Sequence, residues 1–139
     1  VLLADGHKNI QIDQDKRVIS KSDDWILSAS IDGNLTIQSI KDSNITKHFN
    51  LKKTIAGASI DQNKLAVLFY DNEIALYNLD TKKMLFEDQG GRSVAVNMKV
   101  VNPYFLNDLV LFPTLDGKIV IVSIKHKKRL RTVLVSSED

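Results

Sequence analysis

The sequence predicts an all-β protein built from repeated antiparallel strand–turn–strand units. The unit occurs three times, with turns at Asp32-Gly33, Asp71-Asn72 and Asp116-Gly117. These dipeptides are typical of hairpins, because Asp, Asn and Gly accept the positive φ that such turns require. No segment keeps apolar residues at helical spacing over three turns, so no helix is expected.

The spacing of the turns indicates what the repeat builds. Asp32 and Asp71 are 39 residues apart, and Asp71 and Asp116 are 45 residues apart. A repeat of about 40 to 45 residues with about four strands is typical of a β-propeller blade. The middle strands of a blade are covered on both faces, which accounts for continuous apolar runs such as 65–69. A β-sandwich would also contain short strands, but it would not need this recurrence.

Taken in order, the chain begins with a partial blade over residues 1–23, whose turn is Asp5-Gly6. Complete blades are predicted over about 24–52, 53–88 and 89–135. Such a stack does not close a ring, because an open stack leaves an apolar face and bare strand edges. We therefore expect the remaining blades of a longer parent chain, or a second copy, to complete it.

The end of the repeat resembles that of a known family. Residues 116–130 and 78–86 resemble the DGxLYALDaxTGkxlW blade of quinoprotein-type (PQQ-like) propellers, an outline shared with WD-repeat blades. The family's turn Gly is replaced here by Lys82 or Lys83, and its closing Trp by Phe86. The resemblance implies a scaffold like the propeller lipoproteins of bacterial outer-membrane assembly, which bind proteins in the periplasm or cell envelope.

Composition excludes several classes of function. The formal charge of +2 creates no large field for nucleic acid, and no apolar run approaches the roughly 20 residues of a membrane-spanning helix. The absence of cysteine excludes disulfides and Cys-based zinc sites. The chain starts at Val1 without an initiator Met, so we expect it to be part of a longer protein or a processed product.

No catalytic or metal-binding motif is found, so the sequence predicts a non-catalytic protein without a cofactor. His7, His48 and His126 lie far apart, and no Gly-x-Ser-x-Gly or phosphate-binding loop is present. The repeated Asp residues are explained by their turns. The alternative is a fragment of a quinoprotein dehydrogenase, which would need acidic residues around a calcium-bound quinone.

One segment is a candidate for contact with a protein partner, and one basic cluster for contact with phosphate or nucleic acid. The additional length of the last repeat falls within residues 89–108, where Arg92 and Tyr104 have the side chains favoured at interface hot spots. The alternative is that Tyr104 and Phe105 pack beneath their own loop. The densest basic cluster has no aromatic residues between its charges and is interpreted as a solvated hairpin. Its members are Lys125, Lys127, Lys128, Arg129 and Arg131.

Overall fold

The structure, a computed structural model, describes residues 2–5, 8–42, 44–92 and 99–135 of the chain. In these residues the chain forms fourteen β-strands and no helix, which confirms the all-β prediction. The strands divide between two compact units, residues 1–55 and 56–139.

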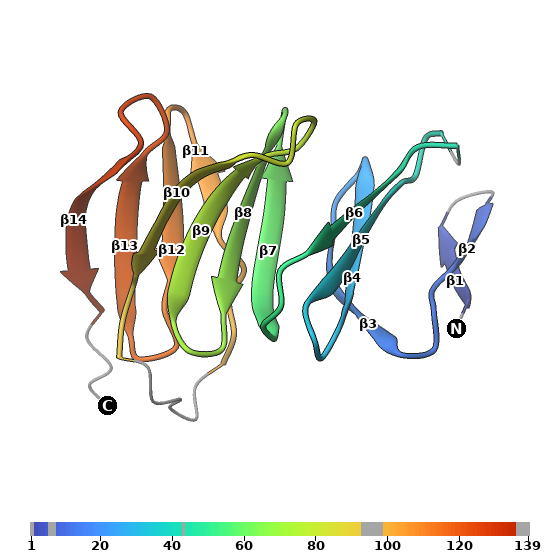
Figure 1. The fold of residues 1–139 in the computed structure, drawn as a ribbon, viewed down its shortest axis with the longest axis horizontal. Coiled ribbons are helices and arrows are strands. Elements are labelled where there is room, and N and C mark those ends of the chain that lie inside the picture. The colour runs from blue at the N-terminus through green and yellow to red at the C-terminus, as the bar shows by residue number, and fades with distance from the viewer. Residues whose placement is uncertain (1, 6–7, 43, 93–98, 136–139) are drawn as a thin grey trace. The chain divides into compact units, whose positions relative to one another are not determined.

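The first unit contains a two-stranded and a four-stranded antiparallel sheet (Figure 1). Its strands are β1 (Leu2–Asp5), β2 (Lys8–Gln11), β3 (Lys16–Lys21), β4 (Trp25–Ser30), β5 (Asn34–Ser39) and β6 (Thr46–Asn50). β1 pairs with β2, and the other four follow one another in the order β3-β4-β5-β6. Ile10 and Ile12, at and just after β2, pack with Ile26 of β4 in a small buried cluster.

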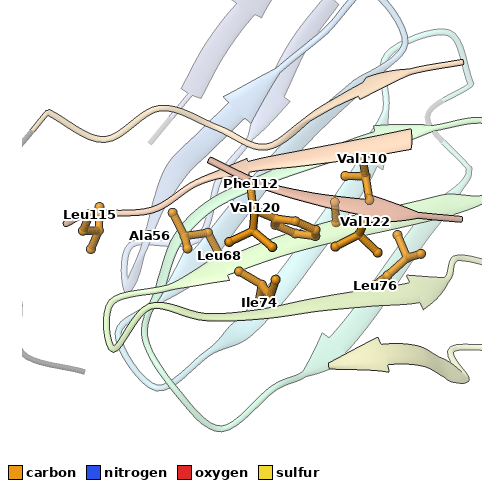
Figure 2. Close-up of a cluster of buried hydrophobic side chains, with 10 residues drawn as sticks. Ala56, Leu68, Ile74, Leu76, Val110, Phe112, Leu115, Val120 and Val122 are labelled. Atoms are coloured by element: carbon orange, nitrogen blue, oxygen red, sulfur yellow. The ribbon is translucent and has the colours of Figure 1, made fainter. Parts of the chain in front are cut away.

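The second unit contains two four-stranded antiparallel sheets. The first consists of β7 (Ile55–Asp61), β8 (Lys64–Phe69), β9 (Glu73–Asn78) and β10 (Met84–Gln89). The second consists of β11 (Tyr104–Leu106), β12 (Leu109–Pro113), β13 (Lys118–Ser123) and β14 (Lys128–Leu134). Apolar side chains from both sheets gather between them in one buried cluster (Figure 2).

Backbone hydrogen bonds recur at the predicted spacing. At one end of each four-stranded sheet the amides of Leu51, Gly90 and Val135 donate to the carbonyls of Gly33, Asn72 and Gly117, over 2.8 to 2.9 Å. At the other end the amides of Ile40, Leu79 and Ile124 donate to the carbonyls of Asp24, Asn63 and Asp108, over 2.7 to 2.9 Å. Each set steps along the chain by 39 and then 45 residues, so the three sheets are copies of one repeat.

The three predicted turns have the expected backbone. Their second residues, Gly33, Asn72 and Gly117, have φ values of 87°, 66° and 85°. Only glycine and, at some cost, asparagine adopt this left-handed region readily, which explains the choice of residue at all three turns. The predicted turn at Asp5-Gly6 lies partly outside the described residues.

The structure places the start of the first complete repeat earlier than predicted. Residues 16–21 were assigned to the partial blade 1–23, but as β3 they pair with β4. The connection is a tight turn, in which the Ser22 amide donates to the Trp25 carbonyl and the Ser22 hydroxyl accepts from the Trp25 amide. The sequence has no Asp-Gly or Asn-Gly turn signal between these two strands, so the predicted blade boundary at residues 23–24 wrongly separated β3 from β4.

Candidate partner surface of the second unit

The turn at Asp116 is held by its own side chains. The Thr114 hydroxyl donates to Asp116 Oδ1 over 2.6 Å and accepts from the Lys118 amide over 3.1 Å. The Asp116 side chain is only 4% exposed, and the Lys118 ammonium lies 3.4 Å from its Oδ2. Asp116 is therefore a buried structural carboxylate, in agreement with its interpretation as a turn residue.

Arg92 is attached to this turn through its main chain. Its amide donates to Asp116 Oδ2 over 2.9 Å, and its carbonyl accepts from Asn72 Nδ2 over 2.7 Å. Gly91 makes the approach possible, because a Cβ there would clash with Asp116 Oδ1. The backbone of Arg92 is thus fixed on both sides while the residue is exposed to solvent.

The same contacts set the ionisation of Asp116. Burial raises its pKa, whereas the Arg92 amide, the Thr114 hydroxyl and the charge of Lys118 lower it. The hydrogen bonds and the charge outweigh burial, so the pKa of Asp116 lies below its ordinary value of 3.8. Asp116 is therefore an anion at neutral pH.

Asn72 joins the two sheets of the second unit. Its side chain is fully buried, and its Oδ1 accepts from the Leu115 amide over 2.7 Å. Together with the bond to the Arg92 carbonyl, this satisfies main-chain groups from two other segments. The sequence indicated Asn72 only as a turn residue, because its side-chain partners lie 20 and 43 residues away along the chain.

Tyr104 lies on a different element, the edge strand β11. It pairs with Leu111, whereas the next residue, Phe105, pairs with Val110 and packs against the core cluster. Cross-strand partners share a face, so Tyr104 and Leu111 lie on the opposite face of the sheet. Phe105 therefore packs against the core, whereas Tyr104 is 44% exposed.

We call this opposite side of the β11–β14 sheet the outer face. The strand registers place on it Tyr104, Leu106, Leu109, Leu111, Pro113, Ile119, Ile121 and Val133. All eight are partly or largely exposed, Leu106 by 53%. The sequence contained a signal for this surface, since 109–112 and 119–122 are apolar at every position and so provide two apolar faces.

The other candidates from the sequence lie elsewhere. In the basic cluster, Arg129 forms an ion pair with Asp88 at 2.9 Å, and Lys125, Lys127, Lys128 and Arg131 are exposed. His48 Nδ1 lies 3.3 Å from Thr36 Oγ1, and His7 is outside the described residues. Among the residues that the structure describes, no group of three or more His, Asp or Glu is placed to hold a metal ion, and no helix could span a membrane.

The first unit has a pocket of 360 Å³ with both polar and apolar walls. It is lined by Asp15, Lys16, Asn34, Leu35, His48, Phe49 and Asn50. The Lys16 ammonium already donates to Thr36 Oγ1 over 2.7 Å and forms an ion pair with Asp13 at 3.2 Å. The charge of Lys16 is therefore compensated within the protein by Asp13.

Comparison with known proteins identifies the fold and one named relative. No protein-family model matches the chain. The plasminogen-binding protein PgbB of Helicobacter pylori, strains J99 and 26695, is 35% identical over 83 residues, which cover 58% of this chain and 15% of that protein. The chain thus spans less than a sixth of the length of the relative that it matches.

Three solved structures share the architecture. The designed protein Ika8 has a TM-score of 0.68 at 15% identity, covering 89% of this chain and 38% of its own. BamB from Moraxella catarrhalis has 0.64 at 14%, covering 80% and 34%, and Saccharomyces cerevisiae Sqt1 has 0.60 at 14%, covering 81% and 31%. BamB and Sqt1 are β-propellers, so the three four-stranded sheets of this chain are propeller blades.

Proposed function

We propose that this chain is a blade segment of a bacterial cell-envelope propeller that binds a protein partner. The proposal is supported chiefly by Arg92. Its main chain is fixed by hydrogen bonds with the side chains of Asn72 and Asp116, while the residue is exposed. A fixed backbone lowers the entropy lost when an exposed side chain is ordered by a partner. Tyr104 supplies an exposed aromatic side chain on β11, the next strand along the chain.

The relative supports a protein as the partner. PgbB is named for binding plasminogen, and plasminogen is therefore the first partner to be tested with this chain. The nearly balanced charge of the chain favours a protein over nucleic acid, for which a basic surface would be needed.

The more specific assignment to quinoprotein-type repeats is part of this proposal. It is supported by Lys82, which has φ 64° in the turn where that repeat family has glycine. The second candidate function, within the same class of binding scaffold, is a role in outer-membrane assembly like that of the propeller lipoproteins.

The proposed function is not catalytic. The alternative is a quinoprotein dehydrogenase, which needs several acidic ligands around a calcium-bound quinone. Dye-linked oxidation of alcohols or sugars, measured with added quinone and calcium, tests this directly. Turnover above that of the protein-free control would overturn the proposal.

The binding site is tested with Arg92→Ala combined with Tyr104→Ala. Plasminogen is passed over the immobilised chain, and affinity is measured by biolayer interferometry; a pull-down from the native cell is done in parallel. We expect the double variant to lose at least tenfold in affinity for the captured partner, because Arg and Tyr dominate interface energetics.

The matched control is Lys125→Ala combined with Met84→Ala, which also removes one exposed cation and one exposed apolar side chain. It should bind as the unchanged chain does. Circular dichroism must show both variants folded. Equal binding by the unchanged chain and the Arg92/Tyr104 variant would place the partner site elsewhere.

A further inference from the structure

Four apolar positions are shared by all three blades. The spacing of 39 and 45 residues aligns Leu27, Ala29, Leu35 and Ile37 of the first blade with Ala66, Leu68, Ile74 and Leu76 of the second. In the third blade the same positions are Leu111, Pro113, Ile119 and Ile121, in the middle of the outer face.

The burial of these positions differs between blades. In the first and second blades all eight residues are at most 2% exposed. In the third blade all four are partly exposed, although they are equally apolar. The four positions are therefore apolar in every blade, and only in the third blade are they exposed to solvent.

The second unit shows what covers these positions when they are buried. Ala66, Leu68, Ile74 and Leu76 pack in one cluster with Val110, Phe112, Val120 and Val122 from the facing side of the next blade (Figure 2). The outer face of the third blade thus has the same apolar positions as the face of the second blade that packs against the third.

From this repetition we infer that the outer face is the docking surface for a further four-stranded blade, which is apolar at the positions of Val110, Phe112, Val120 and Val122. The occupant is a different blade and not the first blade of a second copy. A blade of this kind buries the outer face in the way that the third blade buries the second.

The first blade of this chain does not fit that requirement. Its residues at the four required positions are Ile26, Ser28, Thr36 and Gln38, of which three are polar. Thr36 already accepts a hydrogen bond from Lys16 and contacts His48, and Gln38 Nε2 donates to the Gln11 carbonyl. Docking this side on the outer face would bury hydroxyl and amide groups against Leu111 and Ile121, which is unfavourable.

The edge of the outer face remains open in this arrangement. Ser59 aligns with Tyr104, and it keeps partial exposure although its hydroxyl donates to the carbonyl of Pro103, just before the next blade. Tyr104 would likewise lie at the margin of the junction, where a protein partner can reach it. The inference does not depend on the proposed protein-binding function.

The test uses the lack of cysteine in this chain, so that Ile121→Cys introduces a single thiol. Its rate of maleimide labelling is measured in the chain and in a longer chain that carries a second copy of residues 91–135 after Val135. We expect labelling to slow at least tenfold in the longer chain. Leu130→Cys, on the edge strand β14 and 48% exposed, should be labelled at the same rate in both chains.

A matched extension decides the chemistry of the occupant. In the appended copy, changes equivalent to Phe112→Ser, Val120→Thr and Val122→Gln reproduce the first blade, and this extension should give no protection. A second apolar extension, built from residues 52–90, should protect as the first does.

Three results would overturn the inference. The first is unchanged labelling of Ile121→Cys with both apolar extensions, whether or not they fold, because an apolar junction should order them. The second is equal protection by the polar extension. The third is a dimer of the chain, seen by light scattering during gel filtration, in which Ile121→Cys is already protected, since the second copy would then be the occupant.

Discussion

The central strands of the second and third blades have the same apolar character but different burial. In β8 every residue after Lys64 is buried, whereas in β12 buried and half-buried residues alternate. The reason is that β8 has both faces covered, while β12 has only one covered face, that of Val110 and Phe112. A continuous apolar run in the sequence therefore predicts a strand that can be buried on both faces. The structure shows that β8 is buried on both faces and β12 on only one.

The largest expected effect compares Leu76 with its equivalent Ile121. Leu76→Ala should lower the free energy of unfolding by about 2 to 5 kcal/mol, because the side chain is fully buried and a cavity would remain. Ile121→Ala should cost less than half as much, since Ile121 is partly exposed. Urea unfolding followed by circular dichroism measures both, and equal costs would mean that the outer face is covered.

A second comparison exchanges the turn residues. Asn72→Gly keeps the positive φ but leaves the buried Leu115 amide and Arg92 carbonyl without their side-chain partner. The buried Leu115 amide should cost about 1 to 3 kcal/mol, and the carbonyl of the exposed residue Arg92 about 1 kcal/mol, so we expect a total of about 2 to 4 kcal/mol.

The matched control for this exchange is Gly117→Asn, the reverse change at the equivalent turn of the third blade. Asparagine tolerates a φ of 85°, so the cost should stay below about 1 kcal/mol. A loss at Gly117→Asn as large as that at Asn72→Gly, again in urea, would contradict the bridging role of Asn72.

The third prediction concerns the pH dependence of the Asp116 turn. Asp116→Asn should cost about 1 to 3 kcal/mol at neutral pH, because the charged hydrogen bonds from Arg92 and Thr114 are weakened. The folded-state pKa of Asp116 is below 3.8, so its contribution is complete above this value and is lost as the pH falls through the folded-state pKa. Thermal unfolding between pH 7 and pH 2 should show the two proteins converge at acid pH; a constant difference would rule out this linkage.

The smallest expected effect is a gain. Lys82 and Lys127 occupy the same turn of the second and third blades, with φ values of 64° and 53°. Relief of this backbone conformation should make Lys127→Gly more stable by about 0.5 to 1 kcal/mol. Lys125→Gly, at a neighbouring exposed position without positive φ, should be slightly less stable. Differential scanning calorimetry would contradict the prediction if both variants shifted Tm in the same direction.

The candidate site was only partly predictable. Arg92 and Tyr104 were selected because of residue type and the longer connection, and the structure locates the six additional residues between Gly90 and Tyr104. The further prediction that this connection protrudes at one rim of the ring falls on residues 93–98, which lie outside the described part of the chain. The buried links from Asn72 and Asp116 to Arg92 left no local pattern in the sequence.

By itself the sequence determined the strands, the three turns with positive φ, the absence of helix in the described residues and the recurrence at 39 and 45 residues. These features depend on backbone preferences and on apolar patterns within a few neighbouring residues. Only the tertiary structure decided that β3 belongs to the first complete blade, that Asn72 bonds to Leu115 and that the outer face is uncovered. The physical reason is range: these outcomes depend on which strands and faces meet, and neither polarity nor turn chemistry along the chain encodes a partner 43 residues away.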